Sequence, residues 1–224
     1  MTTRPFDHFI YAARDLEPMC RAFEDLSGVK PGPGGSHPGL GTRNALASLG
    51  DSVYLEFLAT DPAQPSGGTL ADPIRSFTIP RLFSYMVRTG DLELVQQQLA
   101  KHGIESDLFG ASRSAPDGST LRWRLLFPRQ HRFGELVPRF IDWMDTRHPA
   151  TTSVAGCRFE SFEVGHPDPV ALAALLRDLE TEIRVQTAEQ PYLRLTIGTP
   201  RGSLVLGSDV ALPRQGDAPA PPGA

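Results

Sequence analysis

Two side chains suited to chemistry, His8 and Glu56, lie in short apolar stretches of the chain. His8 belongs to FDHFIYAA and is expected on the same strand face as Phe6 and Ile10, whereas Glu56 lies within YLEFL. A carboxylate in an apolar strand is costly unless it is paired, hydrogen-bonded or bound to a metal ion. These stretches therefore indicate a site, although polar strand residues also serve structure or face solvent.

A third candidate, His37, lies in the glycine-rich segment GGSHPGLGTRN, which is predicted to be a loop. Histidine changes its charge near neutral pH and suits acid–base catalysis. The alternative is a loop histidine that fixes the turn by a hydrogen bond. Asn44, at the end of the segment, either holds the same loop or contacts a ligand. The segment lacks the Lys-Ser/Thr ending of a phosphate-binding loop, so nucleotide binding is not predicted.

Arg122 and Arg124 lie two residues apart and therefore share a strand face, opposite to Trp123. If the arginine face lines a pocket, the two guanidinium groups can clamp a carboxylate or phosphate. Otherwise they form a solvated strand face. Trp123 is a further candidate for contact with a substrate. The remaining histidines are expected to be structural or exposed: His102, His131, His148 and His166.

The composition of the 224-residue chain, 40% hydrophobic and 21% charged, favours a soluble globular protein. A net charge of -4 without a basic stripe argues against a nucleic-acid partner. No apolar run approaches the roughly 18 residues that a membrane span needs. Because the N-terminus lacks the apolar stretch of an export signal, a cytoplasmic location is expected. Cys20 and Cys157 would there be reduced structural thiols.

The order strand, helix, strand, strand recurs along the chain. The first round has a strand at 6–13, a helix from Asp15 to a stop at Gly28, and strands at 44–49 and 53–59. The second round has a strand at 82–88, a helix from Asp91 to Gly103, and strands at 104–109, 121–127 and 136–144. The third has a strand at 159–164, a helix opened by Asp168 and Pro169, and strands at 184–187, 192–197 and 203–207.

This order predicts an α+β fold of repeated βαββ(β) modules. Residues 1–150 are predicted to hold two paired modules, at about 6–60 and 82–145. Residues 151–207 are predicted to form a third βαβββ half-module, and residues 208–224 a disordered tail rich in Pro and Ala.

Aligning the two DLE phrases, at residues 15–17 and 91–93, places His8 opposite Ser84, a shift of 76 residues. Aligning YLEFL with FIDWM places Glu56 opposite Asp142, a shift of 86 residues. An insertion of ten residues in the second module explains the difference between the shifts.

The sequence resembles the glyoxalase-like domain family of the vicinal oxygen chelate superfamily. The resemblance rests on FDHFIYAARDLE, on GGSHPGLGTRNALASLGDSVYLEFLATDP, and on LRWRLLFP with RFIDWMDTRHPA, and runs from about residue 6 to residue 207. It implies a cup-shaped sheet that holds a divalent metal between the first and last strands of the modules. The ligands that it implies are His8, Glu56 and Asp142, with His37 as a further ligand or, like Glu56, a catalytic acid–base group.

Zn, Mn, Fe and Ni all suit imidazole and carboxylate ligands. In the family, such a metal binds neighbouring oxygens of a small metabolite and stabilises an enolate or similar oxyanion, in lyases, isomerases and dioxygenases. Ser84, however, stands where a second histidine is expected, and serine is a poor ligand. The alternative is therefore a metal-free protein that sequesters a small molecule or antibiotic. Many relatives are homodimers, which the resemblance implies here too.

Overall fold

The computed structural model describes residues 3–50, 52–64, 71–114 and 120–209. Within these residues, twelve strands form two sheets, of eight and four strands. The strands are β1 (Phe6–Ala12), β2 (Gly32–His37), β3 (Thr42–Ser48), β4 (Tyr54–Thr60), β5 (Arg81–Arg88), β6 (Ser106–Ser114), β7 (Thr120–Pro128), β8 (Arg139–Asp142), β9 (Arg158–His166), β10 (Arg184–Thr187), β11 (Tyr192–Thr199) and β12 (Gly202–Gly207). The helices are α1 (Leu16–Ser27), α2 (Ala71–Arg75), α3 (Leu92–Lys101) and α4 (Pro169–Asp178), with short 3-10 turns η1 (Gly134–Leu136) and η2 (Pro149–Thr151).

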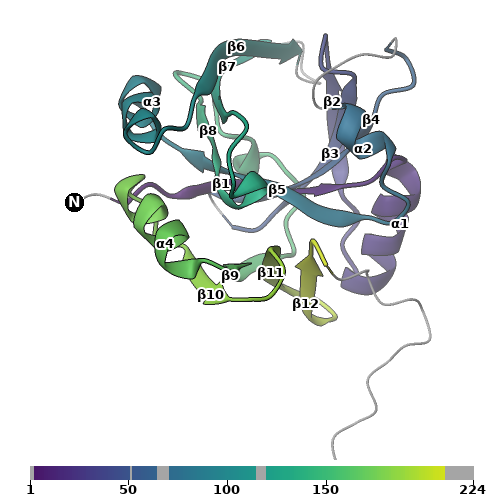
Figure 1. The fold of residues 1–224 in the computed structure, drawn as a ribbon. Coiled ribbons are helices and arrows are strands. Elements are labelled where there is room, and N and C mark those ends of the chain that lie inside the picture. Colours follow the sequence, from purple (N-terminus) through teal and green to yellow (C-terminus); the bar gives the residue numbers. More distant parts are fainter. Residues whose placement is uncertain (1–2, 51, 65–70, 115–119, 210–224) are drawn as a thin grey trace, which may run out of the picture.

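The larger sheet consists of two modules that share one topology. Its strand order is β2-β3-β4-β1-β5-β8-β7-β6. In each module the first strand pairs parallel with the last, β1 with β4 and β5 with β8, and the modules join through the antiparallel pair β1–β5. The sheet curls until its two edge strands, β2 and β6, contact each other (Figure 1). The predicted α+β fold of repeated modules in a cup-shaped sheet is thus confirmed.

Helices α1 and α3 begin and end, and α4 begins, where the sequence predicts. Asp91 accepts a hydrogen bond from the backbone N–H of Leu94 at the start of α3, and Asp168 caps α4, with Pro169 in its first turn. These side chains satisfy backbone donors that the first turn leaves free. Gly28 ends α1 with φ of 77°, a left-handed conformation that glycine adopts without steric cost.

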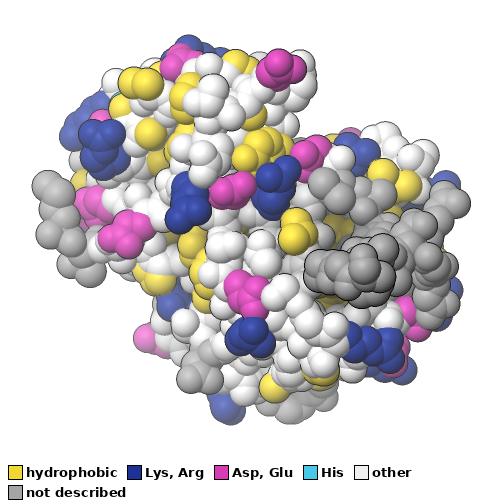
Figure 2. Space-filling model, turned by 90° about the horizontal axis from the view of Figure 1, so that it is seen from below, with side chains coloured by type: hydrophobic (Ala, Val, Ile, Leu, Met, Phe, Trp, Pro, Cys, Tyr) yellow, Lys and Arg dark blue, Asp and Glu magenta, His cyan; other side chains and the backbone are white. Residues whose placement is uncertain are grey.

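The third unit follows the predicted order of elements but pairs its strands differently. Its sheet has the order β10-β9-β11-β12, so β9 lies between a parallel and an antiparallel neighbour instead of pairing with the last strand. The unit packs across the larger sheet (Figure 1). On the face seen in Figure 2, positive and negative side chains are interspersed and neither sign dominates.

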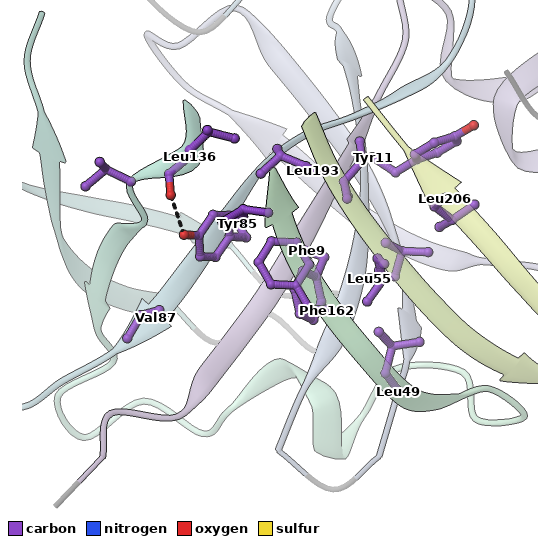
Figure 3. Packing of buried hydrophobic residues seen from close by; sticks show 14 of the residues in the cluster. Phe9, Tyr11, Leu49, Leu55, Tyr85, Val87, Leu136, Phe162, Leu193 and Leu206 are labelled. Carbon is purple, nitrogen blue, oxygen red and sulfur yellow. Dashed lines mark hydrogen bonds between the residues drawn. The ribbon is translucent and has the colours of Figure 1, made fainter. Parts of the chain in front are cut away.

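One continuous core joins the third unit to the two modules. Phe162 of β9 packs against Phe9 of β1 and Tyr85 of β5, with ring centroids 4.9 and 4.6 Å apart (Figure 3). The Tyr85 hydroxyl donates a 2.7 Å hydrogen bond to the Leu136 carbonyl. This core covers one face of the larger sheet, so the opposite, concave face is left to form a cavity.

Three segments differ from the sequence-based expectation. The Gly- and Pro-rich stretch at 32–37, predicted to be a loop, forms β2. Helix α2 was not predicted, and the strand expected at 136–144 is shorter, since a 3-10 turn precedes β8. Most of the predicted tail, residues 210–224, lies outside the described residues.

A bulge at Asp7 sets the face on which each residue of β1 lies. Phe6 pairs with Val87 and His8 with the next residue, Met86, so Asp7 has no partner on β5. A bulge residue shifts the alternation of side chains by one. Phe6 consequently packs with Phe9 in the core, whereas His8 faces the cavity. The expectation that Phe6 and His8 share a face is therefore wrong.

The second module carries the same kind of bulge at Phe83 of β5. Its neighbours Ser84 and Leu82 pair with Ile10 and Tyr11 of β1, so Phe83 itself has no partner on β1. Phe83 follows Asp7 by 76 residues, the shift that relates Ser84 to His8. The last strands can therefore be aligned by register.

Glu56 pairs with Ile10 on β1, and Arg139 pairs with Met86, the equivalent of Ile10, on β5. Arg139, not Asp142, is thus the counterpart of Glu56. The alignment of YLEFL with FIDWM is wrong by three residues because the phrases match in character but not in register.

Candidate functional site

A cavity of about 70 Å³ lies in the concave face of the larger sheet. Its polar side comes from the first module, with His8 on β1, His37 on β2, Asn44 on β3 and Glu56 on β4. The rest of the wall is largely apolar and includes Ile10, Leu40, Leu46, Tyr54, Leu58, Met86, Trp123, Leu125, Phe127, Ile141, Trp143 and Pro149, together with Arg139. The cup thus has one polar half and one apolar half.

His8 is fixed on both sides of its ring. Its Nδ1 lies 2.7 Å from Asp7 Oδ1, its Nε2 lies 3.6 Å from Glu56 Oε2, and the ring stacks on Tyr54 with centroids 4.5 Å apart. The bulge makes the first contact possible, because in a regular strand Asp7 and His8 point to opposite faces. An acidic neighbour on one ring nitrogen leaves the other directed at the cavity.

Asp7 is fully buried and holds its charge through several donors. His148 Nε2 and Trp143 Nε1 each lie 2.9 Å from Asp7 Oδ2, and Arg88 lies 3.9 Å away. Burial alone raises the pKa of a carboxyl group, but the hydrogen bonds and charges of His148 and His8 outweigh it and lower the pKa of Asp7 to about 2. Asp7 is therefore a carboxylate at neutral pH and accepts the Nδ1 proton of His8.

Glu56 is held by a short chain of side chains from β2 and β3. Asn44 Nδ2 donates to Glu56 Oε1 at 2.5 Å and lies 3.2 Å from His37 Nε2. Its Oδ1 accepts from the Gly35 amide at 2.8 Å, which fixes the orientation of the amide. His37 Nδ1 in turn lies 2.9 Å from Thr42 Oγ1. His37 is thus the end residue of a strand and not a loop residue.

Five of the sequence-predicted residues line the cavity: His8, His37, Asn44, Glu56 and Trp123. Three others lie elsewhere. Arg122, Arg124 and Asp142 do not line the cavity. Arg124 forms an ion pair with Glu93 of α3, and Asp142 Oδ1 accepts from the backbone N–H of Met144. Their chain neighbours Trp123, Ile141 and Trp143 face the cavity. Because side chains alternate along a strand, the two arginines and Asp142 point to the opposite face.

Sequence reasoning missed Asp7, Trp143, His148 and Arg139. Asp7 precedes His8, and regular alternation predicts that it lies on the other face. Only recognition of the bulge reveals the contact. His148 was expected to be structural or exposed, yet it reaches Asp7 from the loop before η2. No sequence signal connects residues that are this far apart in the chain.

The residues present do not fit a resident divalent metal. The described part of the chain contains no group of three or more His, Cys, Asp or Glu side chains placed to hold one. The Asn44 amide N–H group lies against His37 Nε2 and Glu56 Oε1, so these two atoms face a hydrogen-bond donor. Glu56 keeps its second oxygen, so His8 and Glu56 remain as two candidate ligands. The second module supplies Ser84 and the guanidinium of Arg139, which has no lone pair to offer a metal.

The two cysteines take no part in the site. Cys20 and Cys157 are not joined in a disulfide. Burial raises the pKa of both thiols to about 11, so both are protonated at neutral pH.

Two fused modules of identical topology around one cavity define a class of proteins with a cup-shaped sheet. The family model described as "Glyoxalase-like domain" matches residues 6–180. The chain therefore belongs to the glyoxalase-like domain family, as the resemblance of its sequence phrases predicted. A search of curated proteins found no match.

The comparison with solved structures finds similar chains at low sequence identity. A hypothetical protein from Staphylococcus aureus is 17% identical with a TM-score of 0.63, over 92% of this chain and 87% of that one. Methylmalonyl-CoA epimerase from Mycobacterium tuberculosis is 18% identical with a TM-score of 0.47, over 62% and 87%. The corresponding Streptomyces coelicolor epimerase is 15% identical with a TM-score of 0.48, over 66% and 100%. Among the described helices, none is long and apolar enough to span a membrane.

Proposed function

We propose that this chain is an enzyme that moves a proton on a small, oxygen-bearing molecule held in the cavity, with His8 and Glu56 as the reacting acid–base pair. One observation carries the proposal. The His8 imidazole is held at Nδ1 by the buried carboxylate of Asp7 and presents Nε2 to Glu56, 3.6 Å away, inside a mainly apolar cavity. A positioned imidazole of this kind suits general acid–base catalysis.

The hydrogen bonds assign the protons. Asp7 is ionised and can only accept, so His8 carries a proton on Nδ1, and in its neutral form it has a lone pair on Nε2. Nε2 takes a proton from the substrate, and Asp7 then stabilises the imidazolium. Glu56 lies on the cavity side of His8, where it exchanges the proton with Nε2. Asn44 and His37 hold the Glu56 carboxylate in place.

The reaction class that follows is proton abstraction next to a carbonyl group, as in an isomerase, epimerase or lyase. The apolar wall excludes water, which strengthens the charge interactions inside the cavity.

Exchange of carbon-bound protons for deuterium tests this proposal directly. Hexan-2-one, 3-phenylpropanal, 2-oxohexanoate and phenylpyruvate would be incubated with protein in D₂O, and their α-proton signals followed by NMR. We expect wild-type protein to accelerate exchange for at least one compound. His8→Gln and Glu56→Gln should each lower the rate about 100-fold or more, the usual contribution of a general acid or base.

His102→Gln is the matched control, because His102 pairs with Asp178 at the end of α3. It should exchange at the wild-type rate. Exchange that persists in both His8→Gln and Glu56→Gln, or no exchange by wild-type protein with any compound, contradicts the proposal.

The family resemblance also implies a metal-dependent reaction through a stabilised enolate or oxyanion. A divalent metal would have His8 and Glu56 as its protein ligands here and would need water or substrate for the remainder. Elemental analysis of purified protein, with His8→Ala and Glu56→Ala beside it, tests this alternative. Near-stoichiometric Zn, Mn, Fe or Ni that disappears in both variants would overturn the metal-free assignment.

A second candidate function is metal-free sequestration of a small molecule. The apolar half of the cavity, with Trp123 and Trp143, favours it, because such walls bind ligands without any reaction. Tight binding in the presence of a chelator, measured by calorimetry without any deuterium exchange, would support sequestration over catalysis.

Homodimerisation and a cytoplasmic location stay predictions that the family resemblance and the sequence suggest. Light scattering during size-exclusion chromatography of the full chain tests the dimer, and a clean monomer would rule it out.

A further inference from the structure

Arg139 is a charged residue in the cavity wall that the proposed reaction does not use. It begins β8 in the second module and lines the cavity beside Phe127 and Ile141. By strand register it is the counterpart of Glu56, so the pseudo-symmetric cup has a carboxylate at one position and a guanidinium at the other.

The guanidinium of Arg139 is only partly satisfied. Its NH2 group donates to both carboxylate oxygens of Glu135, at 3.0 and 2.9 Å. Its NH1 group is buried and has no hydrogen-bond partner in the described part of the chain. A buried donor on a charged group is costly when unpaired, and more so than a neutral donor.

Two aromatic rings flank the same group. The guanidinium carbon lies 5.2 Å from the Phe83 ring centroid and 4.9 Å from that of Phe127. Cation–π contacts of this length hold the plane of the guanidinium but supply no acceptor for its N–H groups. The rings therefore fix the orientation of Arg139, and the buried NH1 has no acceptor within the described part of the chain.

We propose that Arg139 NH1 receives the carboxylate of the substrate, so that the cavity selects small carboxylic acids with an apolar body. The assignment of the bound molecule as a substrate rests on the proposed function, whereas the carboxylate site itself does not. Arginine binds carboxylates through charge-assisted hydrogen bonds.

The positions of Arg139 and His8 set the shape of the ligand. Tyr54, His8, Met86 and Arg139 form one row across four neighbouring strands. Two strand spacings separate His8 from Arg139, roughly 10 Å between backbones. A ligand with its carboxylate at Arg139 extends past Met86 toward His8.

Calorimetric titration with matched ligand pairs tests the carboxylate site. The probes are hexanoate against hexanamide and phenylacetate against phenylacetamide, which differ in charge but hardly in shape. We expect both carboxylates to bind wild-type protein and both amides to bind at least about tenfold more weakly. Inorganic phosphate is included as a bulkier anion and should not bind.

Variants of Arg139 should abolish this preference. Arg139→Gln is expected to weaken carboxylate binding at least about tenfold. Arg139→Lys, which keeps the charge, should lose less. Arg129→Gln is the control, because Arg129 is exposed and paired with Asp107, and it should bind as wild type does. Thermal unfolding of each variant shows whether it is folded, and Arg139→Lys serves if Arg139→Gln is not.

One further variant separates this site from other roles. Glu135→Gln removes the competing carboxylate and should tighten hexanoate binding, which a purely structural Arg139 does not predict. Hexanoate lacks the ketone or aldehyde group that the proposed reaction needs, so its binding is measured independently of that reaction. Failure of the proposed reaction therefore leaves the carboxylate site standing. Equal binding of acids and amides, no binding of either carboxylate to wild-type protein, or undiminished binding by folded Arg139 variants would overturn the site.

Discussion

Asp7 shows how one residue outside the cavity wall governs the chemistry within it. Its carboxylate collects hydrogen bonds from His8, His148 and Trp143, which lie on β1, in the loop before η2 and after β8. Each donor offsets part of the cost of burying the charge. The carboxylate consequently ties the loop that follows β8 to the first strand and fixes the tautomer of His8.

Replacing Asp7 should destabilise the fold in a pH-dependent way. The pKa of Asp7 is about 2 in the folded protein, against an ordinary value of 3.8. A carboxyl whose pKa is lowered by folding adds stability above its unfolded pKa and loses it as pH falls through the folded pKa. The shift corresponds to about 2 kcal/mol. We expect Asp7→Asn to unfold about that much more easily at pH 7, as measured by urea denaturation.

The gap between wild type and Asp7→Asn should close as pH falls from about 4 to about 2. Asp107→Asn is the control, because Asp107 forms an exposed ion pair with Arg129 and should change stability little. A gap that stays constant over this pH range would show that the Asp7 charge is not the source of the stability.

The sequence predicts site residues that stand out as polar side chains in apolar strands. It misses residues whose place in the site follows from the pairing register of the strands. His8 and Glu56 were found because polar side chains are conspicuous in apolar strands. Alignment of FIDWM with YLEFL by residue type predicts Asp142 as the counterpart of Glu56, whereas strand register makes it Arg139. A displacement of three residues moves a side chain to the opposite face of a strand, so character alone cannot choose between the two positions.

At the scale of the element, β2 depends on glycine for its approach to β3. A Cβ atom on Gly34 would lie 1.9 Å from Asn44 Oδ1, far inside van der Waals contact. Glycine at this position lets the backbone of β2 approach the backbone and the amide side chain of Asn44 on β3. The strand was predicted to be a loop because Gly and Pro usually break strands, whereas here the close contact requires them.

Gly34→Ala should therefore disturb the site without touching an acid–base group. The added methyl group displaces the Asn44 side chain, which then loses its hydrogen bond to Glu56 Oε1. We expect deuterium exchange to fall at least about tenfold, since small misplacements of catalytic groups have effects of this size. NMR exchange rates measure it, and circular dichroism confirms that the variant is folded.

Gly110→Ala is the matched control in another strand. Gly110 lies in β6, and its nearest neighbour would be 4.0 Å from the added Cβ, at ordinary contact distance. Its exchange rate should equal that of wild type. Equal rates for Gly34→Ala and Gly110→Ala would mean that Asn44 does not hold Glu56 in a reactive position.

At the scale of the whole molecule, the third unit and the cup share one hydrophobic core. The cavity occupies one face of the larger sheet, and the core shared with β9, β11 and β12 occupies the other. The sequence predicts the order of elements in this unit but not its strand pairing, because pairing is decided by contacts between distant segments. A boundary at residue 151 therefore divides the sequence pattern but not the hydrophobic core.

The shared core predicts that the two modules and the third unit unfold together. Phe162 is 6% exposed and contacts rings of both modules. Phe162→Ala should lower the free energy of unfolding by about 3–5 kcal/mol, the usual cost of removing a buried ring. Urea unfolding followed by tryptophan fluorescence, which reports on Trp123 and Trp143 in the cavity wall, should shift together with circular dichroism.

Val170→Ala on α4 should change neither signal, because Val170 is 79% exposed. If Phe162→Ala shifts circular dichroism but leaves the tryptophan transition at its wild-type position, the third unit folds independently of the cup. Coincident shifts mean that packing on the convex face sets the stability of the cavity on the concave face, since the same sheet forms both. Strand β1 makes this link within one element, because Phe9 points into the shared core while His8 beside it faces the cavity.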